Sequence, residues 1–402
     1  MRILQLIPKM PYPPKDGGAI AAWNLTTGLK QAGHDITILA INTSKHFIDP
    51  ATLPAEVKQV AKWYSVPVST RISPLKALNN LLFGKLPYTL ERFRSKAFEQ
   101  TLRELLEKNE FDIVQCDGLA VTLYIPVIRK YSSARVVYRA HNIEWEIWER
   151  KASKEPDPLK KRYFLLISKR MRRFEKKLMN SYDLLVPITT RDNRILNKMG
   201  NTRPSCVIHS GVDPKKVTSG NIAKSELSFA YIGALDWMPN QEGLGWFLEK
   251  VWAPFTRAHK DLRFFIAGRN APPWLEKKIA RFNGIVYEGE IDDARAFISS
   301  HPVFVAPLFS GSGMRVKIIE AMALGRIVLS TPLGAEGLPV KHDKDILLAT
   351  RSIDFIETLD QMAWNLNRFV PIGENATHLI LEKFDNFVLA DHLASFYLKH
   401  LK

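Results

Sequence analysis

The feature that most constrains the fold of this chain is a run of strand, glycine-containing loop, helix and strand near its start. Residues 3–7 predict a buried strand, residues 8–18 a loop, residues 19–32 a helix that ends at Gly33, and residues 36–41 a second strand. This order is typical of a βαβ unit with parallel strands. The first half of the chain therefore predicts a Rossmann-like domain.

The same alternation restarts in the second half, where residues 227–232, 303–306 and 327–331 predict buried strands. At 402 residues the chain is also long for a single core. We therefore predict an α/β fold of two doubly wound, Rossmann-like domains that face each other across a cleft, with C-terminal helices packing back toward the N-terminal domain. The predicted boundaries give domains at 1–207 and 208–385 and a C-terminal helix at 386–402 that crosses back to the N-terminal domain.

Open α/β sheets bind ligands beyond the carboxyl ends of their strands, and the glycines of this chain gather at such ends. The glycines that follow predicted strands are Gly17, Gly18, Gly233, Gly268, Gly311 and Gly313. Their clustering predicts a ligand site at these loops more strongly than any single loop does.

The stretch from Ser310 to Leu338 predicts a phosphate site. Gly311 and Gly313 form a loop without Cβ atoms, and residues 314–324 predict a helix that Gly325 ends. Arg315 and Lys317 fall in the first turn of that helix, where cations oppose the helix dipole unless an anion lies there. The alternative is a helix with a glycine-rich entry and a solvated basic face.

The charge of the chain indicates an anionic partner. Lys and Arg number 57 against 41 Asp and Glu, a formal net charge of +16, which suits nucleic acid, anionic lipid or nucleotide-sugar phosphates. Cys116 and Cys206 belong to no Cys-x-x-Cys motif, which argues against a disulfide framework and a structural zinc site. The apolar run at residues 1–7 is too short for a signal peptide, and no window reaches the roughly 18 apolar residues of a membrane span. We expect a cytoplasmic protein, at most peripheral on the inner face of the cytoplasmic membrane.

Residues 150–177 predict a strongly basic helix with one apolar stripe. Such a helix suits an anionic membrane surface. Equally, its stripe could pack on its own domain while the charges are solvated, as in most surface helices.

Five motifs together resemble a known family. They are PPKDGG, the AHN of residues 140–142, the HSGVD of residues 209–213, IGALDWMPN and GSGMRVKIIEAMALG. In combination they are similar to a retaining glycosyltransferase of the GT-B fold, in glycosyltransferase family four, over essentially the whole chain. The resemblance implies that a sugar passes from a nucleoside diphosphate sugar to a cell-envelope or exopolysaccharide acceptor, including a lipid-linked one. It also implies a hexosyltransferase-type enzyme with an acceptor-side N-terminal domain, a donor-binding C-terminal domain and no metal cofactor.

The EAMALG motif carries the strongest part of this resemblance. It places Glu320 at the second glutamate of the family's signature, which implies binding of the donor ribose. The first glutamate would fall at position 312, which is Ser312 here. The family also holds the diphosphate with Arg and Lys in the loop after the first strand of its second domain, and GALDWMPN contains neither. We therefore expect Arg315 first, and Lys317 second, to bind the diphosphate.

The remaining predicted site residues lie on the other loops. His141 follows a buried strand, and the resemblance implies a catalytic contact with the donor sugar. Asn142 and Glu144 are expected on the acceptor side, and so, more weakly, are Asp16 and Asp117, which could instead cap backbone N–H groups. No DxD triplet suits a metal, so the enzyme is predicted to be metal-independent. The other predicted donor contacts are Gly17, Gly18, Gly233, Arg269, Ser312, Gly313 and Met314.

Three other functions remain open at this point. A catalytically inactive family member that acts as a binding subunit would agree with Ser312 in place of the first signature glutamate. A GT-B sugar-nucleotide epimerase-like enzyme would need an acid/base carboxylate pair, which the sequence does not place. A basic nucleic-acid-binding protein would agree with the charge, but the chain has no nucleic-acid motif. We therefore expect no nucleic acid as a partner.

Overall fold

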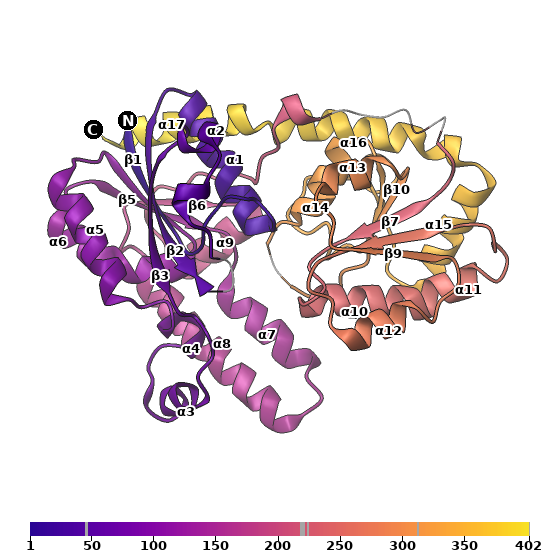
Figure 1. The fold of residues 1–402 in the computed structure, drawn as a ribbon, viewed down its shortest axis with the longest axis horizontal. Helices are drawn as coiled ribbons and strands as arrows, with labels where there is room; N and C mark the ends of the chain where they lie inside the picture. Colours follow the sequence, from indigo (N-terminus) through magenta and orange to yellow (C-terminus); the bar gives the residue numbers. More distant parts are fainter. Residues whose placement is uncertain (45–46, 218–221, 223–224, 312, 402) are drawn as a thin grey trace. The chain divides into compact units, whose positions relative to one another are not determined.

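The computed structural model describes the whole chain except residues 45–46, 218–221, 223–224, 312 and 402. It divides into two compact units (Figure 1). The first comprises Met1–Gly211 and Asn386–Lys402, the second Val212–Gly311 and Arg315–Asp385, and Gly313 and Met314 are grouped with the first.

The first unit contains a six-stranded parallel sheet in the order β3-β2-β1-β4-β5-β6. This is the strand order of a dinucleotide-binding Rossmann domain. Its strands are β1 (Arg2–Ile7), β2 (Asp35–Thr43), β3 (Lys62–Val68), β4 (Ile113–Asp117), β5 (Arg135–Ala140) and β6 (Leu184–Pro187). The central strands are buried on both faces, which explains why they appear in the sequence as continuous apolar runs. Sequence reasoning missed β3, an edge strand in which exposed and buried residues alternate.

Helices of the first unit cover both faces of this sheet, and α3 (Pro74–Phe83) lies apart from its core. The helices of the unit are α1 (Gly17–Gln31), α2 (Ala55–Lys58), α3, α4 (Tyr88–Glu91), α5 (Lys96–Lys108), α6 (Ile125–Tyr131), α7 (Glu144–Lys154), α8 (Pro158–Leu178), α9 (Thr190–Lys198) and α17 (Asn386–Leu401), with short 3₁₀ turns at Pro50–Thr52 and Leu119–Tyr124.

The helix α17 is a structural part of the first unit. It packs against α1 so closely that a Cβ on Gly28 would lie 2.7 Å from the Cβ of Ala390. Its buried residues join the same hydrophobic cluster as Ile3 and Ile38. The Tyr397 hydroxyl donates to Gln115 Oε1 on β4 at 2.7 Å. The C-terminal segment therefore completes the core that the N-terminal strands begin.

The predicted single basic helix at residues 150–177 is wrong: the segment forms the end of α7 and most of α8. The break lies at Pro156–Asp157–Pro158, since proline disrupts a helix interior but suits its first turn. The Asp157 carboxylate accepts from the backbone N–H of Leu159 at 2.8 Å and of Lys160 at 3.1 Å, and so begins α8. The two helices pack together as a hairpin.

The second unit also contains a six-stranded parallel sheet, in the order β12-β11-β10-β7-β8-β9. Its strands are β7 (Phe229–Ile232), β8 (Phe264–Ala267), β9 (Ile285–Gly289), β10 (Val303–Ala306), β11 (Ile327–Ser330) and β12 (Leu347–Leu348). Its helices are α10 (Met238–Phe247), α11 (Ala253–Phe255), α12 (Pro273–Ile279), α13 (Ala294–Ser299), α14 (Val316–Ala323), α15 (Ser352–Trp364) and α16 (Val370–Lys383), with a π-helical segment at Leu248–Trp252 and short 3₁₀ turns at Pro214–Lys216 and Leu366–Phe369. The predicted α/β class with two doubly wound parallel sheets is confirmed.

Two helix starts in the second unit differ from prediction. The residues that follow the first strand of this unit predict a helix over 242–258, but the helix begins at Met238, because Pro239 occupies its first turn. The helix expected from residue 314 begins at Val316, because Arg315 is its N-cap residue, with φ −91° and ψ 86°. Among the described residues, no helix combines the length and apolar character needed to cross a membrane.

Candidate active site

Lys317 is the central cation of the site in the second unit. From the first turn of α14 its side chain reaches the carboxyl end of β7, where Nζ donates to Ile232 O at 3.2 Å and Asn240 Oδ1 at 3.0 Å. Nζ also lies 4.3 Å from the centroid of the Tyr231 ring. Within the described part of the chain no carboxylate forms an ion pair with it. Burial, and next the charge of Arg315, lower the pKa of Lys317 to about 7.

The loop after β7 is shaped to admit this ammonium group. A Cβ on Gly233 would lie 2.7 Å from Asn240 Nδ2 and 3.2 Å from Lys317 Nζ. A Cβ on Gly268 would lie only 2.2 Å from Gly233 O, so the loops after β7 and β8 meet through their backbones. Asn240, which sequence reasoning missed, donates to Ala234 O at 2.9 Å and turns its Oδ1 to Lys317. The glycines are therefore needed for space rather than for an unusual φ angle.

Arg315 lies at the start of the same helix and is 5% exposed. Its Nη2 is 3.5 Å from Ser310 O, and a Cβ on Gly311 would lie 3.2 Å from that nitrogen. Gly311 and Gly313 have φ angles of +97° and +78°, which favour glycine. The predicted donor contact Ser312 lies outside the described residues. The structure thus brings the two predicted diphosphate cations together, with Lys317 turned to the β7 loop.

The other predicted donor residues surround this helix start or lie on neighbouring loops. Glu320 is one turn further along α14, and Arg295 Nε lies 3.7 Å from its Oε1. Burial raises the pKa of Glu320, and the charge of Arg295 opposes this rise. Arg269 is partly buried, and its carbonyl accepts from Leu235 N at 2.8 Å. Met314 is largely buried.

Sequence reasoning also missed a carboxylate at this loop. Ser310 Oγ donates to Glu242 Oε2 at 2.7 Å. The pair links the glycine loop to α10, and so helps to hold the loop that precedes Arg315.

In the first unit, His141 is tied to a buried carboxylate. It follows β5, and its Nε2 hydrogen-bonds Asp117 Oδ1 at the end of β4. Asp117 also accepts from Arg139 Nη1 at 3.2 Å and Gln115 Nε2 at 3.1 Å. Burial alone would raise the pKa of Asp117, but the charges of Arg139 and then His141 hold it well below its usual range. An anionic Asp117 therefore fixes the imidazole ring and favours a proton on Nε2.

The alternative that Asp117 is a loop residue capping a backbone N–H is wrong, because it ends a buried strand and is 2% exposed. Arg139 is 0% exposed, and in the described residues its Nε and Nη2 have no hydrogen-bond partner. Sequence reasoning missed Arg139. The sequence signal was present, because Arg139 and His141 are two residues apart at the end of one strand.

Asp16 acts as the N-cap of α1. Its Oδ1 accepts from Ala19 N at 3.0 Å and forms an ion pair with Lys9. A Cβ on Gly18 would lie 3.4 Å from Lys9 Nζ, so a further cation, missed in the sequence, lies at the loop that holds Gly17. The acceptor-side role of Asp16 stays a prediction.

Two carboxyl groups lie at the start of α7. Asn142 Nδ2 donates to Glu144 Oε1 at 3.4 Å, and burial raises the pKa of Glu144. Glu175, from α8, accepts from the backbone N–H of Glu144 at 3.2 Å and of Trp145 at 2.9 Å. It replaces the missing side-chain cap of α7, whose N-cap residue is Ile143. Burial raises the pKa of Glu175 to about 8.

This raised pKa predicts a pH dependence of stability. The folded state holds the Glu175 proton more tightly than the unfolded state, so its stabilising contribution is complete at acidic pH and is lost as pH rises toward about 8. Between about pH 5 and pH 8, the Tm of Glu175→Gln should fall less than that of the wild type. Thermal unfolding across that range measures the difference, with Glu149→Gln, which changes an exposed carboxyl on the neighbouring helix α7, as control. Parallel curves for Glu175→Gln and the wild type would contradict the assignment.

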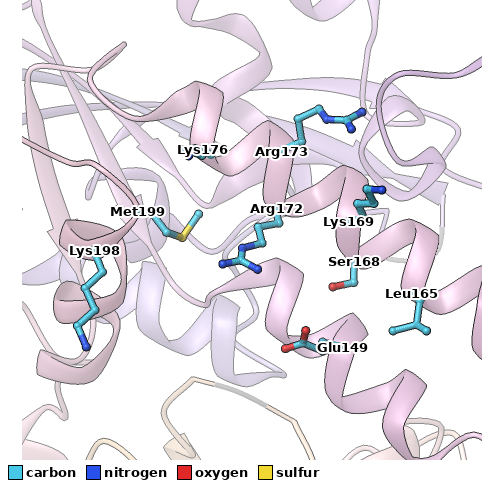
Figure 2. A pocket seen from close by; sticks show the side chains of 9 residues that line it. All are labelled: Glu149, Leu165, Ser168, Lys169, Arg172, Arg173, Lys176, Lys198 and Met199. Atoms are coloured by element: carbon cyan, nitrogen blue, oxygen red, sulfur yellow. The ribbon is translucent and has the colours of Figure 1, made fainter.

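A basic groove of about 570 Å³ lies on the surface of the first unit (Figure 2). Its lining residues come from α7, α8 and the end of α9, and they are Glu149, Leu165, Ser168, Lys169, Arg172, Arg173, Lys176, Lys198 and Met199. The guanidinium of Arg172 lies 4.8 Å from the centroid of the Trp145 ring. As far as the chain is described, none of the five cations forms an ion pair with a carboxylate. The groove therefore carries an excess of positive charge on the predicted basic segment.

In the described ranges no group of three or more His, Cys, Asp or Glu residues is arranged to hold a metal ion. Metal independence stays a prediction.

Comparison with known proteins gives matches over both units. A family model described as Glycosyltransferase Family 4 matches residues 15–216, half of the chain, and a model described as Glycosyl transferases group 1 matches residues 226–365. An uncharacterised 44.6 kDa protein in the cps region of Klebsiella pneumoniae is 24% identical over 395 residues, which cover 96% of this chain and 97% of that protein.

Solved structures share the fold over the full length. Sucrose-phosphate synthase from Thermosynechococcus elongatus matches with a TM-score of 0.74 and 14% identity, over 99% of both chains. HepE of Anabaena in complex with UDP and glucose matches with a TM-score of 0.66 and 13% identity, over 99% of this chain and 100% of that one. HepE has also been solved with UDP-glucose. These likenesses confirm the predicted two-domain architecture.

Proposed function

The chain belongs to glycosyltransferase family 4, as its motifs predicted, and from that premise we propose that it transfers a sugar, with retention of configuration, from a nucleoside diphosphate sugar to a cell-envelope or exopolysaccharide acceptor. Glycosyltransferase activity follows from the family. The identity of the donor, the stereochemistry and the acceptor are the proposed parts.

One observation carries the donor half of the proposal: Lys317 and Arg315 lie together at the start of α14, and Lys317 Nζ is bonded only to neutral oxygens in the described structure. Two neighbouring cations repel each other, and a diphosphate would relieve that repulsion by binding both. The same groups would stabilise the charge that develops on the leaving diphosphate. HepE, which shares the fold, has been solved with UDP and with UDP-glucose, so UDP is the first nucleotide to test.

On the first unit we propose that His141 contacts the donor sugar and that Asp117 positions it. The ring nitrogen that does not face Asp117 is then an acceptor for a sugar hydroxyl. We name no general base. Glu320 would accept from the ribose hydroxyls, and the charge of Arg295 opposes the rise that burial causes in its pKa.

For the acceptor, the relative in a cps region supports a role in polysaccharide synthesis. The cations of the basic groove, for which the described residues provide no carboxylate partner, support an acceptor held at an anionic membrane surface, such as a lipid-linked glycan on the inner face of the cytoplasmic membrane. Residues 150–177 would then contact that surface.

Thermal-shift measurement with UDP, GDP and ADP tests the donor proposal. A nucleotide at about 100 times its Kd should add about 2.7 kcal/mol to the free energy of unfolding, and we expect UDP to do so. If none of the three raises the Tm, the proposal is wrong. With an active donor, NMR of the first-formed product then tests retention, since inversion at the anomeric carbon would contradict it.

A further inference from the structure

The helix α3 presents an apolar face that the described protein does not cover. Leu75, Leu78, Leu82 and Phe83 are 81%, 55%, 64% and 79% exposed, and Ile72 just before the helix is 71% exposed. Leu75, Leu78 and Leu82 follow the i, i+3, i+7 spacing of one helix face. Single exposed apolar residues are ordinary, but a contiguous group marks an interaction surface.

This face belongs to a helix whose two ends are both fixed. Ser73 Oγ accepts from Lys76 N at 3.5 Å, and so caps the first turn of α3. At the other end Arg170 of α8 donates from Nη1 to Asn80 O and from Nη2 to Leu81 O, both at 2.9 Å. A cation at this end also suits the helix dipole. The apolar side chains are therefore held outward by hydrogen bonds, and α3 is fastened to the basic helix α8.

Cations predominate around α3, where Glu91 of α4 is a carboxylate that accepts from Asn80 Nδ2. The sequence contains no Asp or Glu from Val57 to Leu90. The only acidic residue of α8 is Glu175, which is buried and caps α7, whereas exposed cations run along the helix at Lys160, Lys161, Arg162, Lys169, Arg173 and Lys177. In Figure 1, α3 and the α7–α8 hairpin project from the same side of the first unit's sheet.

We propose that α3 is an apolar anchor that inserts at the boundary between the headgroups and acyl chains of an anionic bilayer, while the exposed cations of α8 bind the lipid phosphates. An apolar helix face beside cations is the pattern of a membrane-surface helix. A second copy of the chain would be a poorer occupant, because it would bring two cationic surfaces together. The inference rests on the proposed membrane-bound acceptor and identifies the element that reaches the bilayer.

Sedimentation with vesicles of phosphatidylcholine, with and without phosphatidylglycerol, tests the anchor. The full chain should bind vesicles that contain phosphatidylglycerol. The double variant Leu78→Asp/Leu82→Asp should lower this partition by roughly 100-fold or more, because two apolar side chains no longer leave water. Ile353→Asp/Trp364→Asp, at exposed apolar positions of the second unit, serves as matched control and should bind as the wild type does.

Charge reversal separates the contribution of the cations from that of the apolar face of α3. Changing Arg172, Arg173, Lys176 and Lys177 to Glu should abolish binding at low salt, whereas Lys250→Glu/Lys277→Glu should not. A fluorophore that reports polarity, attached at Leu82→Cys, should shift to the blue on binding if α3 enters the bilayer. An unshifted spectrum, or unchanged partition of the α3 variant, would overturn the anchor. The anchor would also be overturned if the wild type binds no vesicles and light scattering shows that it is a dimer while the α3 variant is a monomer.

The UDP thermal shift, measured without vesicles, distinguishes failure of the anchor from failure of the proposed function. The α3 variant should keep its Tm and its UDP response, since the replaced side chains are exposed. A wild type that binds vesicles but no nucleotide would refute the donor proposal and leave the anchor intact.

Discussion

Replacing Lys317 with methionine is expected to remove most of the stabilisation by UDP and to lower kcat/KM by roughly 10² to 10³-fold. A charge-assisted hydrogen bond contributes about 1.5–3 kcal/mol. Losing one hydrogen-bond donor to a developing oxyanion lowers the rate by about 10² to 10³-fold. Methionine keeps the length of the side chain and removes its charge. Because burial lowers the pKa of Lys317, the charged form opposes folding, and the variant should be at least as stable as the wild type.

The control for this experiment is Lys250→Met, which removes an exposed lysine of the same unit. Thermal unfolding with and without UDP, together with steady-state kinetics, provides both measurements. A Lys317→Met variant with a normal UDP response would refute the diphosphate role, and a variant that unfolds at a much lower Tm would show a structural role instead.

The same lysine should make nucleotide affinity depend on pH. Its pKa is about 7 in the free protein, and a bound diphosphate must raise it, so binding takes up a proton above that pH. The Kd for UDP should therefore increase as pH rises above about 7, by at most tenfold per unit. Calorimetry in buffers of different ionisation enthalpy measures the uptake directly, and the uptake should disappear in Lys317→Met.

Replacing Asp117 with alanine should be the most destabilising change at the site, because it leaves Arg139 without its carboxylate in a fully buried position. Removing one partner of a buried ion pair costs about 3–5 kcal/mol. The change also frees His141 from the group that positions it. We expect a lower urea midpoint together with a loss of transfer activity.

The double variant Asp117→Ala/Arg139→Met separates these two effects. It removes the uncompensated charge, so stability should recover in large part while activity stays low, since His141 still lacks its carboxylate. Denaturation in urea and kcat/KM measure the two effects. Activity that recovers together with stability would show that Asp117 acts only through the fold.

The fold was predictable because strands buried on both faces appear as apolar runs and glycines mark their carboxyl ends. The edge strands β3 and β12 were missed. Exposed and buried residues alternate in β3, and β12 has only two residues. The basic segment was predicted as one helix because its composition is uniform, although Pro156 and Pro158 should have divided it.

The direction of Lys317 could not be read from its position on a helix. The direction of the side chain depends on the space left by Gly233, in the loop after β7, and on Asn240 Oδ1, from α10. The link between Asp117 and His141 likewise depends on the pairing of β4 with β5. His141 itself was predictable, because it follows a buried strand directly.

The packing of α17 on α1 and β4 has a consequence for synthesis of the chain. Domains usually fold in the order in which the ribosome releases them. Here the first unit lacks Leu393 and Tyr397 of its core until the whole second unit has been translated. The N-terminal unit begins to fold first and is completed last, so a truncation before Asn386 would damage a unit whose own strands were translated hundreds of residues earlier.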